Sequence, residues 1–316
     1  MVSYATIFAA TVPVFLIIAT GYGLRSSGLM PRAADRTMLA LTLHITYPCY
    51  ILHALAGSTA LREPGNLLAP VLCGMGFVLL GLAIGWLAGP LCGLRTGGGR
   101  RTFSLATAVQ NYGYLPIPIM EAIFPDAQWK GVVFVYTLGI EVAIWTAGVM
   151  ILSGDWRSGL RKVRNPVVGA IVLGVALNLL RWDAFYPGWL MRFIAMMGAC
   201  AFPLGIMVSG ATLADLLAER GALSGGWKTA AGSIALRLAV LPALMLAGAH
   251  WLPLTTTLRE VLAIQAAMPA AVFPILMARQ YGGHEITAVR VLVFTTAASF
   301  FTMPAAIVLA LKWVHS

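Results

Sequence analysis

The chain has 316 residues, of which 59% are hydrophobic and only 10% are charged, and its mean hydropathy is +0.85. A soluble globular protein carries roughly 25% charged residues, so this composition excludes a water-exposed surface of matching size and indicates an integral membrane protein. The formal net charge of +10 does not indicate nucleic-acid binding, because the cations stand in short segments between apolar runs, where membrane topology explains them.

Apolar runs separated by charged or turn-forming residues predict an all-α fold with ten transmembrane helices, since a helix needs roughly 20 residues to cross the hydrocarbon core. No Lys or Arg precedes Arg25, so we expect the first run to be a membrane span and not a secretory signal peptide. The sixth run is short for a span, and the third is long enough to tilt or to extend past the bilayer. The predicted spans are 4–24, 37–56, 67–94, 102–124, 129–153, 166–180, 190–214, 227–250, 258–280 and 286–312.

The cations predict how these spans are oriented. The segments after the odd-numbered spans carry 14 Lys and Arg residues, whereas the segments on the opposite side carry 6. The positive-inside rule therefore places both termini on the non-cytoplasmic side of the membrane.

The two halves of the chain show a weak internal similarity. Three pairs of prolines recur in the same order, 153 to 156 residues apart: Pro13 with Pro166, Pro48 with Pro203, and Pro118 with Pro274. Each half contains five predicted spans, an odd number, so the second half must insert upside down and form an inverted repeat. We expect a first repeat over 1–153, a cytoplasmic connector over 154–165 and a second repeat over 166–316.

Proline-containing segments interrupt the apolar pattern at matching places in the two halves, over 110–118 and 265–274. A broken helix leaves backbone groups that lipid cannot satisfy, so it persists only inside protein or beside a polar cavity. Matched breaks point to the substrate site of a transporter, where the N-termini of the half-helices attract an anion. We therefore expect the two broken helices to cross. The candidate substrate-binding residues are Gln110, Asn111, Tyr112, Pro118, Gln265, Pro269 and Pro274.

Three side-chain amides flank the breaks. The amide of Asn111 can donate to a substrate carboxylate, or it can simply hold the loose backbone in place. Gln110 and Gln265 can contact the substrate or join neighbouring helices through hydrogen bonds.

Ionisable residues inside the predicted spans are candidates for coupling transport to charge or protons. Lone charges there are costly, so Glu141 and Arg237 are interpreted either as a structural ion pair or as a proton-linked switch. Glu121 could titrate during transport or reach the membrane interface. His44 and His53 share the second span and can change charge near neutral pH, although interior histidines with satisfied hydrogen bonds are the expected arrangement. The candidates for charge coupling are Glu121, Glu141, Arg237 and His44.

Other sequence features bear on packing and on the alternatives to a carrier. Gly81, Gly85 and Gly89 recur every four residues and should let a neighbouring helix approach closely. Hydrolase and zinc-peptidase motifs are missing, as is an intramembrane aspartate pair, so we expect no enzyme, no cofactor and no metal. A channel is the alternative that the sequence excludes least.

Gln265-Ala266-Ala267-Met268-Pro269, followed by Val272, Pro274 and Ala278-Arg279-Gln280-Tyr281, resembles the ninth helix of the auxin efflux carrier family. Asn111 with Pro118 is similar to the first crossover of that family, which includes plant auxin carriers and bacterial malonate-type permeases. The resemblance implies an elevator-type permease for small organic anions in a bacterial inner membrane. Spans one, two, six and seven would form its scaffold, and spans three to five and eight to ten its transport domain. A homodimer is one arrangement open to it.

The more distant bile acid/sodium symporters share this architecture, and a sodium-coupled symporter is the alternative within transport. Residues 266–276 contain no polar side chain of the kind that would hold sodium.

Overall fold

The computed structural model describes residues 3–94, 97–124, 126–155, 157, 165–218 and 226–315. Helices joined by short turns form the described parts of the chain, and no strand occurs there apart from one isolated bridge between Gln110 and Ala270. Most of the predicted connector at 154–165 lies outside the described residues.

The first half of the chain contains α1 (Tyr4–Ser26), α2 (Arg32–Leu41), α3 (Tyr47–Leu55), α4 (Leu68–Ala88), α5 (Gly98–Ala108), α6 (Pro116–Ile123), α7 (Gln128–Ala143) and α8 (Val149–Ser153). The second contains α10 (Pro166–Leu179), α11 (Gly188–Ala199), α12 (Ala201–Ala218), α13 (Trp227–Ala235), α14 (Leu241–Trp251), α15 (Thr256–Ala266), α16 (Phe273–Tyr281) and α17 (Glu285–Val314). Wider π-helical turns at Thr42–Thr46, Ile144–Gly148 and Leu236–Val240 join α2 to α3, α7 to α8 and α13 to α14.

In the part of the chain that the structure describes, seven helical segments are long and apolar enough to cross a membrane: Tyr4–Ser26, Arg32–Leu55, Pro64–Ala88, Gln128–Ser153, Gly188–Ala218, Trp227–Trp251 and Glu285–Val314. This number differs from the predicted ten because the fourth and ninth runs are each divided into two short helices, and the sixth forms only the shorter apolar helix α10. The long segments expose large apolar side chains such as Leu87, Met196 and Phe301, which are 72 to 76% exposed. Such surfaces belong in lipid, and the chain is an integral membrane protein.

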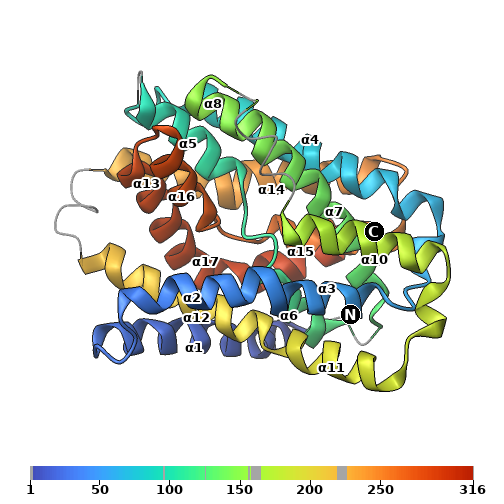
Figure 1. Ribbon diagram of the computed structural model, residues 1–316. Coiled ribbons are helices and arrows are strands. Elements are labelled where there is room, and N and C mark those ends of the chain that lie inside the picture. Colours follow the sequence, from blue (N-terminus) through green and yellow to red (C-terminus); the bar gives the residue numbers. More distant parts are fainter. Residues whose placement is uncertain are drawn as a thin grey trace.

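The helices pack in two groups (Figure 1). In one group α1 lies along α12, and α3 packs against α10 and α11. In the other, α4 packs against α5 and α7, while α17 contacts α13, α15 and α5. The groups meet where α1 contacts α6 and α17, and where α7 contacts α3 and α10.

Glycines on α4 allow the close approach of α5, as the four-residue repeat predicts. A Cβ atom at Gly81 would lie 2.8 Å from Cα of Ala108, and one at Gly85 would lie 2.8 Å from Cα of Ser104. Such contacts are too short for any larger residue unless the backbone moves. The packing prediction for these glycines is therefore confirmed.

The turns between helices gather at two ends of the bundle. At one end Arg25, near the end of α1, forms an ion pair with Asp215 of α12 at 2.9 Å. At the same end the backbone N–H of His284, after α16, donates to Thr102 of α5 at 2.8 Å. The opposite end is held together by the pairs Asn66–Thr255, Thr59–Gln128 and Glu260–His315.

Candidate functional site at the crossing of two broken helices

The two interrupted segments cross inside the bundle. Helix α5 ends at Ala108 and α6 begins at Pro116, whereas α15 ends at Ala266 and α16 begins at Phe273. The two linkers run antiparallel: the N–H of Asn111 donates to the carbonyl of Pro269 at 2.8 Å, and the N–H of Ala271 donates to the carbonyl of Val109 at 3.0 Å. Two short pieces of chain thereby satisfy each other's backbone groups where lipid could not.

Side chains satisfy further backbone groups at the crossing. The Gln265 amide donates to the carbonyl of Tyr112 at 3.0 Å, and the N–H of Ala270 donates to Oγ1 of Thr295 at 3.2 Å. Because α6 and α16 begin here, their N-termini bring partial positive charge to the crossing. The arrangement can hold an anion without a metal or a cofactor.

One polar group of the Asn111 side chain, its amide nitrogen, has no hydrogen-bond partner among the described residues. Its Oδ1 accepts from the N–H of Leu115 at 3.3 Å, whereas its amide nitrogen makes no hydrogen bond among the described residues. Asn111 lines a small cavity of about 30 Å³ together with Pro269 and Ser209. This amide is a donor available to a ligand.

Gln110 and Gln265 are buried in the helical packing. Gln110 is 1% exposed and donates from Nε2 to the Tyr136 hydroxyl at 2.9 Å. Gln265 is fully buried, and its Oε1 makes no hydrogen bond among the described residues. In this conformation both glutamines join helices, the second of the two interpretations that the sequence allows.

Glu141 and Arg237 do not form the ion pair that one interpretation of the sequence predicts. Glu141 accepts hydrogen bonds from the Tyr112 hydroxyl at 2.8 Å, from the Trp145 indole at 2.9 Å and from the Asn165 amide at 3.3 Å. These three donors supply the hydrogen bonds that a buried carboxylate needs, so it requires no cationic partner.

Arg237 belongs to the π-helical turn Leu236–Val240 and lies beside the C-terminal end of the half-helix α5. It is 1% exposed, and its guanidinium approaches the carbonyl of Ala108 at 3.5 Å and the sulfur of Met245 at 3.7 Å. Ala108 is the last residue of α5, where the helix dipole is negative and a cation is stabilising. The helix end thus takes the place of the expected carboxylate.

Three prolines of the broken segments, Pro116, Pro118 and Pro274, lie at the start of half-helices and do not kink continuous ones. Pro116 and Pro274 lie in the first turns of α6 and α16, and Pro118 lies two residues after Pro116. A backbone N–H in a first turn has no partner within the helix, so proline is favoured there. Pro118 lines a larger cavity and Pro269 lines the small one, whereas Pro274 lines neither.

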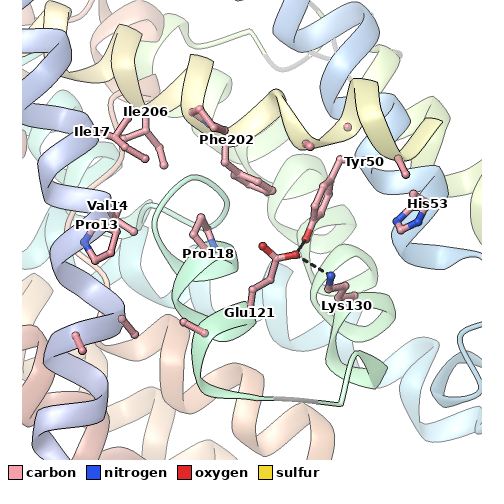
Figure 2. Close-up of a pocket in the computed structure, with 17 residues that line it drawn as sticks. Pro13, Val14, Ile17, Tyr50, His53, Pro118, Glu121, Lys130, Phe202 and Ile206 are labelled. Carbon is pink, nitrogen blue, oxygen red and sulfur yellow. Dashed lines mark hydrogen bonds and ion pairs between the residues drawn. The ribbon is translucent and has the colours of Figure 1, made fainter. Parts of the chain in front are cut away.

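The larger cavity has a volume of about 490 Å³ and lies between α1, α11 and α12 on one side and α6 and α7 on the other (Figure 2). Glu121 lies in its wall and forms an ion pair with Lys130 at 2.7 Å. His53 is exposed and also lines this cavity, and His44 is exposed with Nδ1 3.0 Å from the Ala40 carbonyl. The expectation that both histidines are interior is therefore wrong.

Sequence reasoning missed an aromatic cluster that connects the larger cavity with the crossing. Its members are Tyr47, Tyr50, Tyr114, Phe134 and Phe202, whose ring centroids lie 4.7 to 6.5 Å apart. A Cβ at Gly113 would lie 2.9 Å from the Tyr47 hydroxyl, so the cluster touches the first linker. Two of its rings precede the matched prolines 48 and 203, which is the signal that could have revealed them.

Broken helices that cross within an apolar helical bundle are typical of membrane transport proteins. The sequence model of a family described as "Membrane transport protein" matches residues 6–157 and 156–307. The chain belongs to this family, that of the auxin efflux carriers.

Individual relatives show the same similarity over shorter stretches. Auxin efflux carrier component 3a of Oryza sativa subsp. japonica is 28% identical over 137 residues, which cover 43% of this chain and 21% of the relative. Auxin efflux carrier component 1 of Arabidopsis thaliana gives the same values. Probable auxin efflux carrier component 5b of Oryza sativa subsp. japonica is 32% identical over 142 residues, 44% of this chain and 38% of the relative. The chain thus matches about a fifth to two fifths of these relatives' lengths.

Proposed function

We propose that this chain is a secondary transporter that carries small organic anions, such as carboxylates or auxin-like acids, bound at the crossing of its two broken helices. The observation that carries this proposal is the Asn111 amide nitrogen, which makes no hydrogen bond within the described parts of the chain and lies beside two half-helix N-termini. An amide donor and helix N-termini together favour a carboxylate. The names of the relatives, which are auxin efflux carriers, support the same substrate class.

The proposed architecture is a five-plus-five inverted repeat of ten spans, in which each broken segment and the short α10 count as one span. The group formed by α1–α3 and α10–α12 would be the scaffold. The group formed by α4–α8 and α13–α17 would be the transport domain, which moves past the scaffold as an elevator. Support comes from the packing of the helices in two groups, with both broken segments in the second group and α6 packed against α1 of the first.

The two cavities support alternating access. The larger one is lined by Glu121 and Lys130, close to the end of the bundle that holds the Thr59–Gln128 pair. The smaller one is lined by Asn111 and by Leu213, two residues before Asp215 at the opposite end. We infer an outward-facing conformation in a bacterial inner membrane, with the larger cavity and both termini on the non-cytoplasmic side.

Charge coupling in this proposal runs through Glu121 and Glu141. Glu141 contacts Tyr112 of the crossing and Asn165 at the start of α10, so it joins the transport domain to the scaffold. Arg237 would instead have a fixed electrostatic role at the end of α5. His44, exposed on the outer surface of α2–α3, is the weakest candidate.

Counterflow in proteoliposomes tests the proposed function. Vesicles loaded with unlabelled malonate or indole-3-acetate should accumulate the same labelled compound transiently above its outside concentration, which a channel cannot achieve. Asn111→Ala should abolish this overshoot while the protein remains folded. Equal equilibration with and without internal substrate would contradict a carrier.

A further inference from the structure

The polar groups of the larger cavity are gathered at one place in its wall. Tyr50 and His53 of α3, Glu121 of α6 and Lys130 of α7 are its titratable side chains among the described residues. The other walls, formed by α1, α11 and α12, are apolar.

Two donors converge on a single carboxylate oxygen in this cavity. The Tyr50 hydroxyl donates to Oε1 of Glu121 at 2.6 Å, and Nζ of Lys130 donates to the same atom at 2.7 Å. Figure 2 shows both interactions meeting at Glu121. An ammonium and a phenol at these distances are a preformed binding site for a carboxylate, and here the occupant is the protein's own side chain.

The two donors are held in place independently of Glu121. Tyr50 packs edge-on against Phe202 with ring centroids 4.7 Å apart. The ammonium of Lys130 lies 5.6 Å from the ring centres of both Tyr50 and Trp129, within the range of a cation–π interaction. The Glu121 side chain, by contrast, is 38% exposed. The carboxylate is therefore the member of this trio that can leave most easily.

We propose that the larger cavity is a second anion site, in which an organic monocarboxylate with an apolar body replaces Glu121 on Lys130 and Tyr50. The ligand carboxylate takes the two donors, and its apolar body lies against α1 and α12. The proposal deepens the transport function by naming a monocarboxylate as ligand, but the site rests on its own geometry.

Charge balance opposes this binding in the presence of the Glu121 carboxylate. Lys130 and Glu121 neutralise each other, so an added anion would place two carboxylates beside one cation. A neutral side chain at position 121 removes the competing charge and leaves Lys130 for the ligand. The other titratable groups at this wall, Tyr50 and His53, carry no negative charge near neutral pH. Binding should therefore strengthen when Glu121 is replaced by glutamine.

Equilibrium binding of labelled phenylacetate to detergent-purified protein tests the proposal. The measurements use an Asn111→Ala background, in which binding at the crossing is weakened by about 10- to 150-fold. At a single pH of about 7.5, phenylacetate is ionised. In Glu121→Gln, its affinity at this pH should rise on the order of tenfold. Lys130→Gln should abolish binding, and Tyr50→Phe should weaken it.

Two controls distinguish binding that requires the ligand carboxylate from non-specific binding in an apolar cavity. Phenylacetamide has the same shape without the charge and should not compete. Arg62→Gln removes an exposed cation outside the cavity lining and should leave binding unchanged. Equal binding of the amide, or unchanged affinity in both Glu121→Gln and Lys130→Gln, would overturn the second site. Counterflow by the wild-type protein would still report on the crossing, so the two proposals fail separately.

Discussion

Asn111 and the two nearby glutamines carry the same amide group but use it differently. Gln110 and Gln265 are buried and donate to Tyr136 and to the Tyr112 carbonyl, so their amides stabilise the crossing. Among the residues that the structure describes, Asn111 uses only its oxygen, and its amide nitrogen lies without a partner beside a cavity. Burial and the partners within reach separate the structural amides from the candidate ligand-binding one.

The first prediction concerns this free amide. Asn111→Ala should weaken substrate binding by about 10- to 150-fold, because a hydrogen bond to a charged group contributes about 1.5–3 kcal/mol. Thermal stabilisation by the substrate on purified protein measures the change. Asn111→Asp is the matched variant, since it keeps the size but places a carboxylate against the anion, and it should bind still more weakly. Wild-type affinity in Asn111→Ala would remove this residue from the site.

A second prediction concerns the two buried charges. Glu141 and Arg237 share no hydrogen-bonding partner, so their effects on stability should be independent. In Glu141→Gln, Arg237→Gln and the double variant, the losses of unfolding free energy should add to within about 0.5 kcal/mol. A double variant more stable than either single one would restore the ion pair, because an unpaired buried charge costs more than a missing pair.

At the scale of elements, each broken helix is two half-helices held apart by the opposite linker. The backbone bonds between Asn111 and Pro269 and between Ala271 and Val109 occupy groups that a continuous helix would use internally. The prolines lie beyond these bonds, in the first turns of α6 and α16. The linkers, more than the prolines, therefore keep the helices broken.

This view leads to the third prediction. Pro274→Ala should leave the break open, change the unfolding free energy by less than about 1 kcal/mol and retain transport, because a first-turn proline forgoes no hydrogen bond. Melting temperature and uptake per folded molecule should be measured on one preparation. Loss of uptake with a raised melting temperature would show that the helix had closed and that the proline had prevented it.

The fourth prediction uses the glycines of α4. Gly85→Ala should lower stability by about 1–3 kcal/mol through overpacking, because its Cβ would lie 2.8 Å from the Ser104 backbone. Gly76 lies on the same helix with open space beside it, so Gly76→Ala should be neutral or stabilising by up to about 1 kcal/mol. Thermal melts of the two variants in one detergent give the comparison. Equal melting temperatures would contradict the tight contact between α4 and α5.

At the scale of the molecule, the sequence predicted features with a local signal. Apolar runs, the prolines of the broken segments and the glycine repeat are each recognisable in the local sequence pattern. The all-helical membrane fold and the two breaks could therefore be inferred. The interaction partners of the charged side chains could not be inferred from the sequence. Tyr50 and Glu121 are 71 positions apart, and Arg237 and Ala108 are 129 apart. A sequence shows that a buried charge needs a partner, but several donors, carboxylates or a helix end can satisfy it.

The fifth prediction concerns the membrane orientation. A single reporter cysteine at position 157 should be protected from a membrane-impermeant thiol reagent in intact cells, whereas one at the exposed position 315 should react, because the cation-rich segments stay in the cytoplasm. The four native cysteines must first be replaced, since Cys200 is exposed. Labelling at 157 and protection at 315 would reverse the topology.

The pairing of the two linkers also imposes a waiting interval during synthesis of the chain. In the chain, 158 residues separate Asn111 from Pro269. At roughly 5–20 residues per second, the first linker waits roughly 8–30 s before its partner leaves the ribosome. During that interval, lipid cannot form hydrogen bonds with the unpaired peptide groups of the first linker. The nascent first half must therefore remain beside the insertion machinery or water until the second half arrives, and a ribosome that stalls in between leaves a fragment for membrane proteases.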